Sequence, residues 1–394
     1  MLPENINLSK RINKLSPSLT IAISQKARES KAEGKDVLAF SAGEPDFDTP
    51  QVIKDAAKKA IDEGFTKYTA VAGIPELLEA IQTKLKKENN LDYNTNEIIV
   101  SNGAKQSLFN IFAAILDEGD EVIIPAPYWV TYPELVKYHD GVPVTIETFE
   151  DTGFKITPEM LKNAITPKTK ALILTTPSNP TGAVYSKSEL EALAEVLKDT
   201  NILVISDEMY EKLVYGETFY ATASISEDML KRTITVNGLS KSVAMTGWRF
   251  GYCASKISEL NKAMIKLQSQ ATSNINSITQ KAAIPALLGE VNDDIEMMRK
   301  AFEERMNFVY EEFNKIEGLS AAKPTGAFYI FINHKEIEKD SMKFALELLD
   351  KEGVAVVPGI GFGSEGYFRF SFATSMDILA EGIKRIKKFV ENYK

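Results

Sequence analysis

The sequence predicts an α/β protein with two domains: a large domain with a mostly parallel central sheet flanked by helices, and a smaller α+β domain. The length of 394 residues corresponds to two or three domains. Between about residue 50 and residue 255, helical and strand patterns alternate as they do in open α/β sheets. After about residue 290 the pattern changes to a long charged helix and short strands. We therefore predict a large domain over residues 50–289 and a small domain formed by residues 1–49 and 290–394.

The predicted large domain begins with a helix, because apolar residues from Val52 to Ile61 recur at helical spacing. Short apolar runs that are typical of strands buried on both faces follow at 97–100, 121–124, 171–174 and 202–205, and a further strand is predicted at 233–236. An apolar helix is predicted at 108–116. Ligands of such sheets bind beyond the carboxyl ends of the strands, so the residues that follow each strand are the candidates for chemistry.

The predicted small domain contains a long helix at 293–315 and strands at 328–332, 354–357 and 367–372. There are no internal repeats and no long linker, so we expect the two domains to pack tightly around a shared cleft. The first fifty residues lack enough apolar residues for a core of their own. We expect them to pack on the C-terminal unit or on a partner subunit.

Composition excludes several classes of function. Lys and Arg number 46 and Asp and Glu number 55, a formal net charge of −9 that disfavours nucleic-acid and membrane-surface partners. The single cysteine, Cys253, allows neither an internal disulfide nor a thiolate metal site. No apolar run approaches the roughly 20 residues that span a bilayer, and the first residues lack a signal-peptide core. The expectation is a cytoplasmic protein.

Histidine chemistry is also disfavoured, because His139 and His334 are the only histidines and lie far apart in the sequence. No helical ligand spacing and no GxSxG motif is present, so we expect neither a metal site nor Ser-His-Asp catalysis. Acid–base work is then left to Lys, Tyr or carboxylate side chains.

A GxGxxG pattern at Gly361, Gly363 and Gly366 raises the alternative of a dinucleotide-binding dehydrogenase. That fingerprint requires a helix after the glycines to hold the pyrophosphate. Residues 367–372 instead alternate like a strand. The pattern is therefore interpreted as a glycine-rich loop.

Four segments that follow predicted strands carry the residues with chemical potential. They read SNGAK at 101–105, TPSNPTG at 176–182, SDEMY at 206–210 and SKSVAMTGWR at 240–249. The first opens a helix, whose free N–H groups attract phosphate, although ordinary turns look the same. Lys241 lies among small and apolar residues, where desolvation lowers the pKa of an amine and favours attack on a carbonyl. Taken alone, each segment also fits a structural turn, a helix cap or a surface lysine.

Together, the order and spacing of these segments resemble the class I aminotransferases, enzymes of the pyridoxal 5′-phosphate (PLP)-dependent transferase fold type I. The resemblance extends from SAGEPDF at 41–47 through Tyr128-Trp129 to FRFS at 368–371. The lysine segment has the pattern SKxxAMTGWRxGY, which is similar to that of bacterial aspartate aminotransferases.

The resemblance implies three catalytic residues. Lys241 binds PLP covalently and moves a proton between the substrate and the cofactor. Asp207 pairs with the pyridine nitrogen, and Glu208 is the neighbouring alternative, although adjacent strand positions face opposite ways. Tyr210 and Asn179 hydrogen-bond the phenolic oxygen of PLP.

The resemblance also implies the remaining contacts with the cofactor and substrate. The cofactor ring stacks on Trp129. The phosphate is held by the backbone of Gly103 and Ala104, by Ser240 and Arg249, and by the partner's Tyr68. Lys105 is a further cofactor-binding residue. The substrate contacts Gly43, Trp129 and Asn179, and its α-carboxylate binds Arg369, whose planar fork fits a carboxylate. Its distal carboxylate is met by Lys105, Ser18 and Thr20.

The implied function is reversible transfer of the amino group from L-aspartate to 2-oxoglutarate, giving oxaloacetate and L-glutamate through the pyridoxamine phosphate form, in a homodimer with shared sites. Alternatives stay open. Broader specificity that includes prephenate is one, since Lys10 and Arg11 resemble an N-terminal cation of some relatives. A PLP-dependent lyase is another. A transcription regulator would need a DNA-binding segment of about 60 residues, for which the N-terminus has no room.

Overall fold

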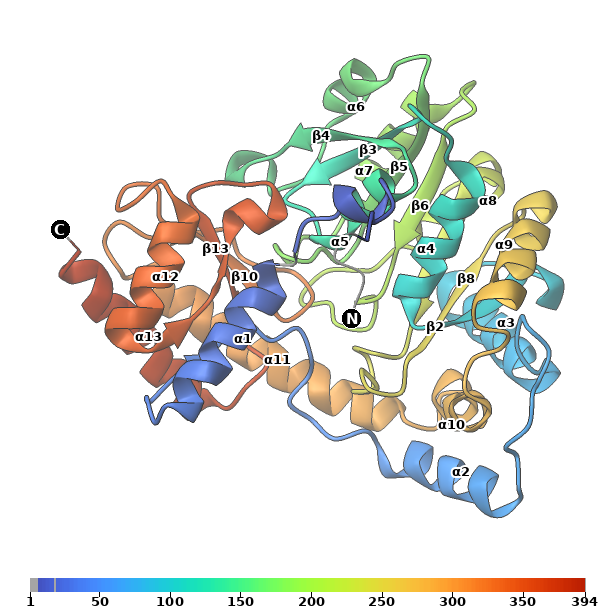
Figure 1. The fold of residues 1–394 in the computed structure, drawn as a ribbon, viewed down its shortest axis with the longest axis horizontal. Helices are drawn as coiled ribbons and strands as arrows, with labels where there is room; N and C mark the ends of the chain where they lie inside the picture. Colours follow the sequence, from blue (N-terminus) through green and yellow to red (C-terminus); the bar gives the residue numbers. More distant parts are fainter. Residues whose placement is uncertain (1–5, 18, 394) are drawn as a thin grey trace.

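The computed structural model describes residues 6–17 and 19–393, and for Thr20 it describes the backbone alone. A seven-stranded sheet forms the centre of the molecule (Figure 1). Its strands are β2 (Ile98–Asn102), β3 (Glu121–Ala126), β4 (Val142–Glu147), β5 (Thr169–Thr175), β6 (Leu203–Asp207), β7 (Thr233–Gly238) and β8 (Phe250–Ala254). Their order is β2-β8-β7-β6-β5-β3-β4. Only β8 runs antiparallel to its neighbours, so the sheet is mostly parallel, as predicted.

Both faces of this sheet are covered by helices, which explains why its strands are continuous apolar runs. Ile173 and Ile205 pack in one buried cluster with the apolar side of α4, while Leu172 and Val204 pack in another with α7. The helices of this part are α2 (Gln51–Asp62), α3 (Pro75–Asn89), α4 (Ala104–Ile115), α5 (Thr131–Tyr138), α6 (Pro158–Ala164), α7 (Lys187–Leu197), α8 (Glu227–Arg232), α9 (Ser258–Ala271) and α10 (Ser277–Leu287). No helix in the described ranges is long and apolar enough to cross a membrane.

A second, antiparallel sheet lies in the C-terminal part, beside α12 and α13 (Figure 1). Its strand order is β12 (Val357–Pro358), β13 (Tyr367–Ser371), β10 (Tyr329–Asn333) and β9 (Ser320–Ala321). The helices of this part are α11 (Asn292–Phe313), α12 (Ser341–Glu352) and α13 (Met376–Glu391). The residue bounds that we predict for the two domains stay a prediction.

One predicted strand, 354–357, is wrong as a single element. It divides into β11 (Val354–Ala355), which pairs in parallel with β1 (Leu38–Ala39), and β12, which pairs with β13. The parallel pairing attaches the segment after α1 (Leu19–Ala32) to the C-terminal part, as expected for the first fifty residues. The glycine-rich segment leads from a short 3₁₀ helix, Gly359–Phe362, into strand β13, so the last glycine is followed directly by a strand and not by a helix.

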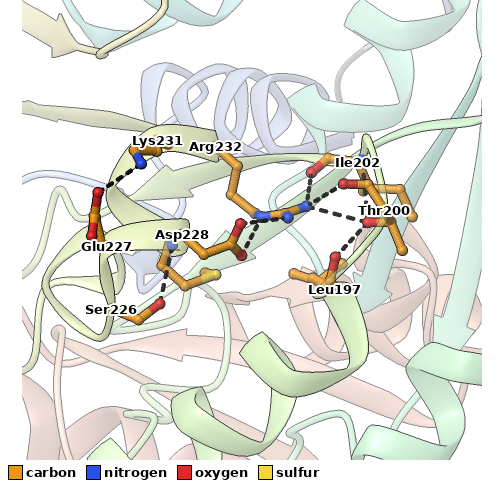
Figure 2. Close-up of polar contacts among 9 residues, drawn as sticks. Leu197, Thr200, Ile202, Ser226, Glu227, Asp228, Lys231 and Arg232 are labelled. Atoms are coloured by element: carbon orange, nitrogen blue, oxygen red, sulfur yellow. Dashed lines mark hydrogen bonds and ion pairs between the residues drawn. The ribbon is translucent and has the colours of Figure 1, made fainter.

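Arg232 ties the amino ends of β6 and β7 together (Figure 2). Its Nε and Nη2 atoms each donate to the Asp228 carboxylate at 2.8 Å. Its Nη1 atom donates to the carbonyl oxygens of Thr200 and Ile202, at 3.0 and 2.9 Å. Arg232 immediately precedes β7, and Ile202 immediately precedes β6. These contacts fix the amino ends of the two strands relative to each other.

Candidate active site

A cavity of 310 Å³ lies at the carboxyl ends of β5, β6 and β7, within the volume range of small-molecule sites. Segments far apart in the sequence meet here, as predicted from the topology of the sheet. The residues predicted from sequence that line the cavity are Gly43, Ala104, Lys105, Trp129, Asn179, Asp207, Tyr210, Ser240, Lys241, Arg249 and Arg369.

Lys241 follows β7 by three residues, and its Nζ donates a hydrogen bond to the carbonyl oxygen of Gly43. Desolvation in the cavity, and then the positive charge of Arg369, lower the pKa of Lys241 to about 8. An ordinary lysine has a pKa near 10.4 and is almost wholly charged at neutral pH. The neutral, nucleophilic amine is therefore more populated here than on a surface lysine.

Asp207 ends β6 and is buried, with its carboxylate facing the cavity. Tyr132 donates its hydroxyl to Oδ2 at 2.7 Å, and the Met209 amide donates to Oδ1 at 3.2 Å. Desolvation raises the pKa of Asp207, while these two donors and the charge of Lys241 oppose the rise. A cation brought next to this carboxylate would favour its ionised form further.

Glu208, the neighbouring alternative, does not line the cavity. Its Oε1 accepts from the Ser206 hydroxyl at 2.9 Å and from the Thr222 amide at 3.0 Å. Desolvation, and then the nearby Glu211, raise the pKa of Glu208 to about 8. Adjacent positions of a strand face opposite sides, so the two carboxyl groups meet different environments. Asp207 is the carboxylate that faces the site.

Arg369 lies on β13 of the small antiparallel sheet, is buried and lines the cavity. Its Nη1 donates to Asn179 Oδ1 at 3.0 Å and its Nη2 to the carbonyl oxygen of Ser41 at 2.8 Å. Its Nε is buried without a partner, and the guanidinium forms no ion pair with any residue that the structure describes. A buried cation without a counter-ion is unfavourable unless an anion joins it. This geometry fits a carboxylate ligand.

The hydroxyl of Tyr210 lies 3.0 Å from that of Tyr329, and both side chains are buried. Desolvation raises the pKa of each phenol, so both keep their protons at neutral pH. The ring of Tyr329 also stacks against Arg369, with 4.3 Å between the guanidinium carbon and the ring centroid. One of the two tyrosines therefore has a proton left to donate into the cavity.

Gly103 and Gly251 keep the space around the start of α4 free of side chains, and we call this the glycine cradle. Gly103 precedes the helix with φ of +80°, and a Cβ there would lie 2.5 Å from Nη2 of Arg249. A Cβ on Gly251 of β8 would lie 2.2 Å from the Ala104 nitrogen. Helix N-termini attract anions through their free N–H groups and dipole, and Arg249 adds a full charge. Gly103 is a backbone neighbour of the cavity lining rather than part of it.

Lys105 and Trp129 lie together, with Nζ 4.9 Å from the centre of the Trp129 ring. Desolvation, and then the charge of Arg249, lower the pKa of Lys105. Trp129 in turn packs edge-on against Tyr132, with 5.5 Å between the ring centroids. The indole face is thereby held at the cavity wall, where a flat ring can stack on it.

Among the predicted site residues that the structure describes, Gly103 and Tyr68 do not line the cavity. Tyr68 is 91% exposed. Ser18 and the side chain of Thr20 lie outside the described residues. Conversely, sequence reasoning missed Tyr132, which holds Asp207, and Tyr329, which contacts Tyr210 and Arg369. A signal existed for Tyr132, which follows Trp129 by three residues at the start of a helix and so lies near it.

Comparison with known proteins assigns the chain to a family. The model of the family described as aminotransferase class I and II matches residues 35–386. An aspartate aminotransferase of Bacillus subtilis is 50% identical, covering 98% of this chain and 100% of the relative. An aspartate/prephenate aminotransferase of Nitrosomonas europaea is 48% identical, covering 97% of this chain and 99% of the relative.

Two solved structures support the same assignment. The aspartate aminotransferase of Rhizobium meliloti superposes with a TM-score of 0.96 at 42% identity, covering 99% of this chain and all of the other. The aspartate aminotransferase of Thermus thermophilus with maleate gives 0.94 at 44% identity, covering 98% of this chain and all of the other. The fold is therefore that of the fold-type I aminotransferases, and the chain belongs to the class I and II aminotransferase family.

Proposed function

We propose that this aminotransferase uses PLP to transfer the amino group of L-aspartate to 2-oxoglutarate, forming oxaloacetate and L-glutamate. The observation that carries the proposal is the meeting of three groups in one cavity: the amine of Lys241, the Asp207 carboxylate, and Arg369 without an anionic partner. The aspartate specificity is supported by relatives that are about half identical and are named for aspartate.

The lining residues fit PLP. Its phosphate suits the start of α4, where the glycine cradle, Ser240 and Arg249 provide N–H groups, a hydroxyl and a positive charge. Its ring suits the wall formed by Trp129, and its pyridine nitrogen suits Asp207. When bound, PLP supplies a ring that withdraws electrons from the substrate α-carbon. Covalent attachment would use the amine of Lys241.

The protein residues then divide the remaining work. Asp207, held by Tyr132 and the Met209 amide, keeps a negative charge at the ring nitrogen and so favours the protonated ring. Tyr210 donates a hydrogen bond from a phenol that stays protonated. Lys241 Nζ, once free, accepts the proton of the substrate α-carbon and returns it.

Two cations orient a dicarboxylic substrate. Arg369 binds the α-carboxylate through the guanidinium N–H groups that Asn179 and Ser41 leave free. Lys105, which also lines the cavity, binds the distal carboxylate, with Ser18 and Thr20 as further proposed contacts. Lysine is a point charge on a flexible stem and selects geometry less strictly than arginine. Its use at the distal end favours tolerance of more than one side chain.

The active form is proposed to be a homodimer in which Tyr68 completes the phosphate site of the partner. In support, the side chain of Tyr68 is 91% exposed, although aromatic rings are normally at least half-buried. Mixing the inactive variants Tyr68→Ala and Lys241→Ala should restore part of the activity through hybrid dimers that contain one complete site. No recovery after verified subunit exchange would contradict a shared site.

The first experiment records the visible absorbance of the purified protein with PLP, before and after addition of L-aspartate without a keto acid. We expect a band of bound PLP that aspartate converts to the pyridoxamine phosphate form in stoichiometric amount. A band that ignores aspartate would refute the substrate while keeping the cofactor, and turnover without pyridoxamine phosphate would favour a lyase. No band after addition of PLP would refute the proposal.

A second candidate activity is amino transfer to prephenate. It is favoured by relatives of 48% identity that are named for both aspartate and prephenate. Arg11 of the proposed N-terminal cation pair lies near His139, just after α5, where desolvation, and then the charge of Arg11, lower the pKa of His139. Formation of the amino product from prephenate and L-aspartate would support this activity, and its reduction in Arg11→Ala would assign the cation.

A further inference from the structure

The segment at the end of β6 contains some side chains that line the cavity and others that point away from the lining. Asp207 and Tyr210 line the cavity, whereas Glu208 and Glu211 do not. The segment is a tight turn, in which the Glu211 amide donates to the carbonyl oxygen of Glu208 at 3.0 Å and the Leu213 amide to that of Tyr210 at 2.8 Å. Because the turn is this tight, a displacement of Glu211 would also displace Tyr210 and Asp207.

Glu211 is held by a closed ring of three side chains, which we call the Lys84–Asn89–Glu211 triad. Lys84 Nζ donates to Glu211 Oε1 and, at 2.7 Å, to Asn89 Oδ1. Asn89 Nδ2 donates to Glu211 Oε2 at 2.7 Å. Both partners of Glu211 belong to α3, so the triad connects the reverse side of the turn to a helix that contributes nothing to the cavity lining.

The triad is almost fully buried, with Lys84 and Glu211 side chains only 6% and 7% exposed. Apolar side chains of similar volume commonly stabilise a fold as well as or better than a buried ion pair, because charges lose their hydration. Stability alone therefore accounts poorly for a triad at this position. A ring that occupies both carboxylate oxygens does, however, fix one orientation of the turn, as directional hydrogen bonds do.

We propose that Lys84, Asn89 and Glu211 are positioning residues that hold Asp207 and Tyr210 in the geometry required to bind PLP. The statement about PLP rests on the proposed function. The triad acts through the backbone of the turn, and none of its members touches the cavity.

The test compares Lys84→Met with a matched control, Lys256→Met. Lys256 also forms a shielded ion pair, with Glu97 at 2.7 Å and side chains 24% and 17% exposed, but at the amino end of β2. Two readouts are used. Amide hydrogen exchange at Met209 and Leu213 in the cofactor-free protein reports local opening of the turn. The PLP dissociation constant and the pH midpoint of the visible band report the geometry around the ring.

Lys84→Met is expected to speed exchange at both amides and weaken PLP binding, each by about tenfold, with a shifted pH midpoint. Lys256→Met should stay within about twofold of wild type in both readouts. Equal behaviour of the two variants would overturn the proposal. Amide hydrogen exchange is measured without cofactor. It therefore tests whether the triad holds the turn even if the wild-type protein does not bind PLP and the proposed function is wrong.

A third variant separates positioning from stability. Replacing the whole triad, Lys84→Met with Asn89→Leu and Glu211→Met, leaves no unpaired buried charge, so thermal stability should return toward wild type. PLP affinity should stay low, and recovery of affinity together with stability would refute positioning. If this variant does not fold, Lys84→Met with Glu211→Gln gives the same decision, because it also leaves no unpaired buried charge and keeps the shape of the Glu211 side chain.

Discussion

Replacing Arg369 by lysine tests the proposed role of the guanidinium, because the charge is kept while the fork is lost. Arginine carries five N–H donors, and two are used by Asn179 and Ser41. The remaining three include the buried, unpartnered Nε. Lysine can keep one strong contact with the α-carboxylate, but it cannot make two parallel ones and still satisfy both protein acceptors.

The magnitude follows from those contacts. Losing one charge-assisted hydrogen bond to the α-carboxylate costs about 1.5–3 kcal/mol, and leaving one buried acceptor unpaired costs about 1 kcal/mol more. The total of about 2.5–4 kcal/mol corresponds to a loss between about 10²- and 10³-fold in kcat/KM for L-aspartate. Arg299→Lys is a suitable control, since Arg299 pairs with Glu296 and Glu303 on α11 and does not line the cavity.

The assay measures the half-reaction with L-aspartate and with its α-amide, isoasparagine, for both wild type and Arg369→Lys. If Arg369 binds the α-carboxylate, most of the penalty should vanish with the amide, which lacks the negative charge. Such a cycle isolates the pairwise interaction from general damage to the protein. An equal penalty with both substrates, or a variant within about threefold of wild type on L-aspartate, would refute the assignment.

Three further predictions concern protonation and stability. Burial raises the pKa of Glu208 to about 8, against an ordinary 4.5, so the stability that its protonated form contributes is present below pH 4.5 and is lost as the pH rises toward 8, by about 5 kcal/mol at most. Glu208→Gln should therefore melt at a higher temperature than wild type at pH 9. A difference in Tm between variant and wild type that is the same at pH 6 and at pH 9 would contradict this. Arg232→Ala should lower the free energy of unfolding by about 2–4 kcal/mol in denaturant titrations, because the Asp228 carboxylate, the Thr200 and Ile202 carbonyl oxygens and the Thr200 hydroxyl lose their donor, yet leave the PLP affinity unchanged. The rate of PLP association with the cofactor-free protein should rise with pH and level off above about 8, where the Lys241 amine is neutral; a pH-independent rate from pH 6 to 9 would exclude the lowered pKa.

The sequence predicted the centre of the sheet well because its strands are buried on both faces. β3, β5 and β6 therefore contain uninterrupted apolar runs, and helices between them imply parallel neighbours. β4 was missed because it is an edge strand with mostly exposed or half-buried residues. β8 was missed because its buried sequence, FGYCA, mixes glycine, aromatic and small residues without an apolar run.

The candidate site also contains residues that the sequence predicted and residues that it did not. Residues at the carboxyl ends of strands, such as Asp207 and Lys241, could be predicted because topology brings those ends together. Tyr329 could not, since a buried aromatic residue in a sequence looks the same whether it packs in a core or lines a site. Tyr132 was missed although its helical spacing from Trp129 indicated a place near the site. Strand alternation predicted that only one of Asp207 and Glu208 faces the ring, the family resemblance favoured Asp207, and the structure places Asp207 at the cavity.

The charges that line the cavity explain why the site suits anionic ligands in a chain with a net charge of −9. Lys105, Lys241, Arg249 and Arg369 bring four cationic side chains to the lining, against the single carboxylate of Asp207. Arg369 and Arg249 both contribute to lowering the pKa of Lys241. A phosphate beside Arg249 and a carboxylate beside Arg369 would offset those charges, and the pKa of Lys241 would then rise. Before the ligands bind, the lowered pKa leaves more of the amine neutral and nucleophilic, which suits attachment of the cofactor. Once the ligands are in place, the higher pKa makes the amine a stronger base, which suits the later abstraction of a proton.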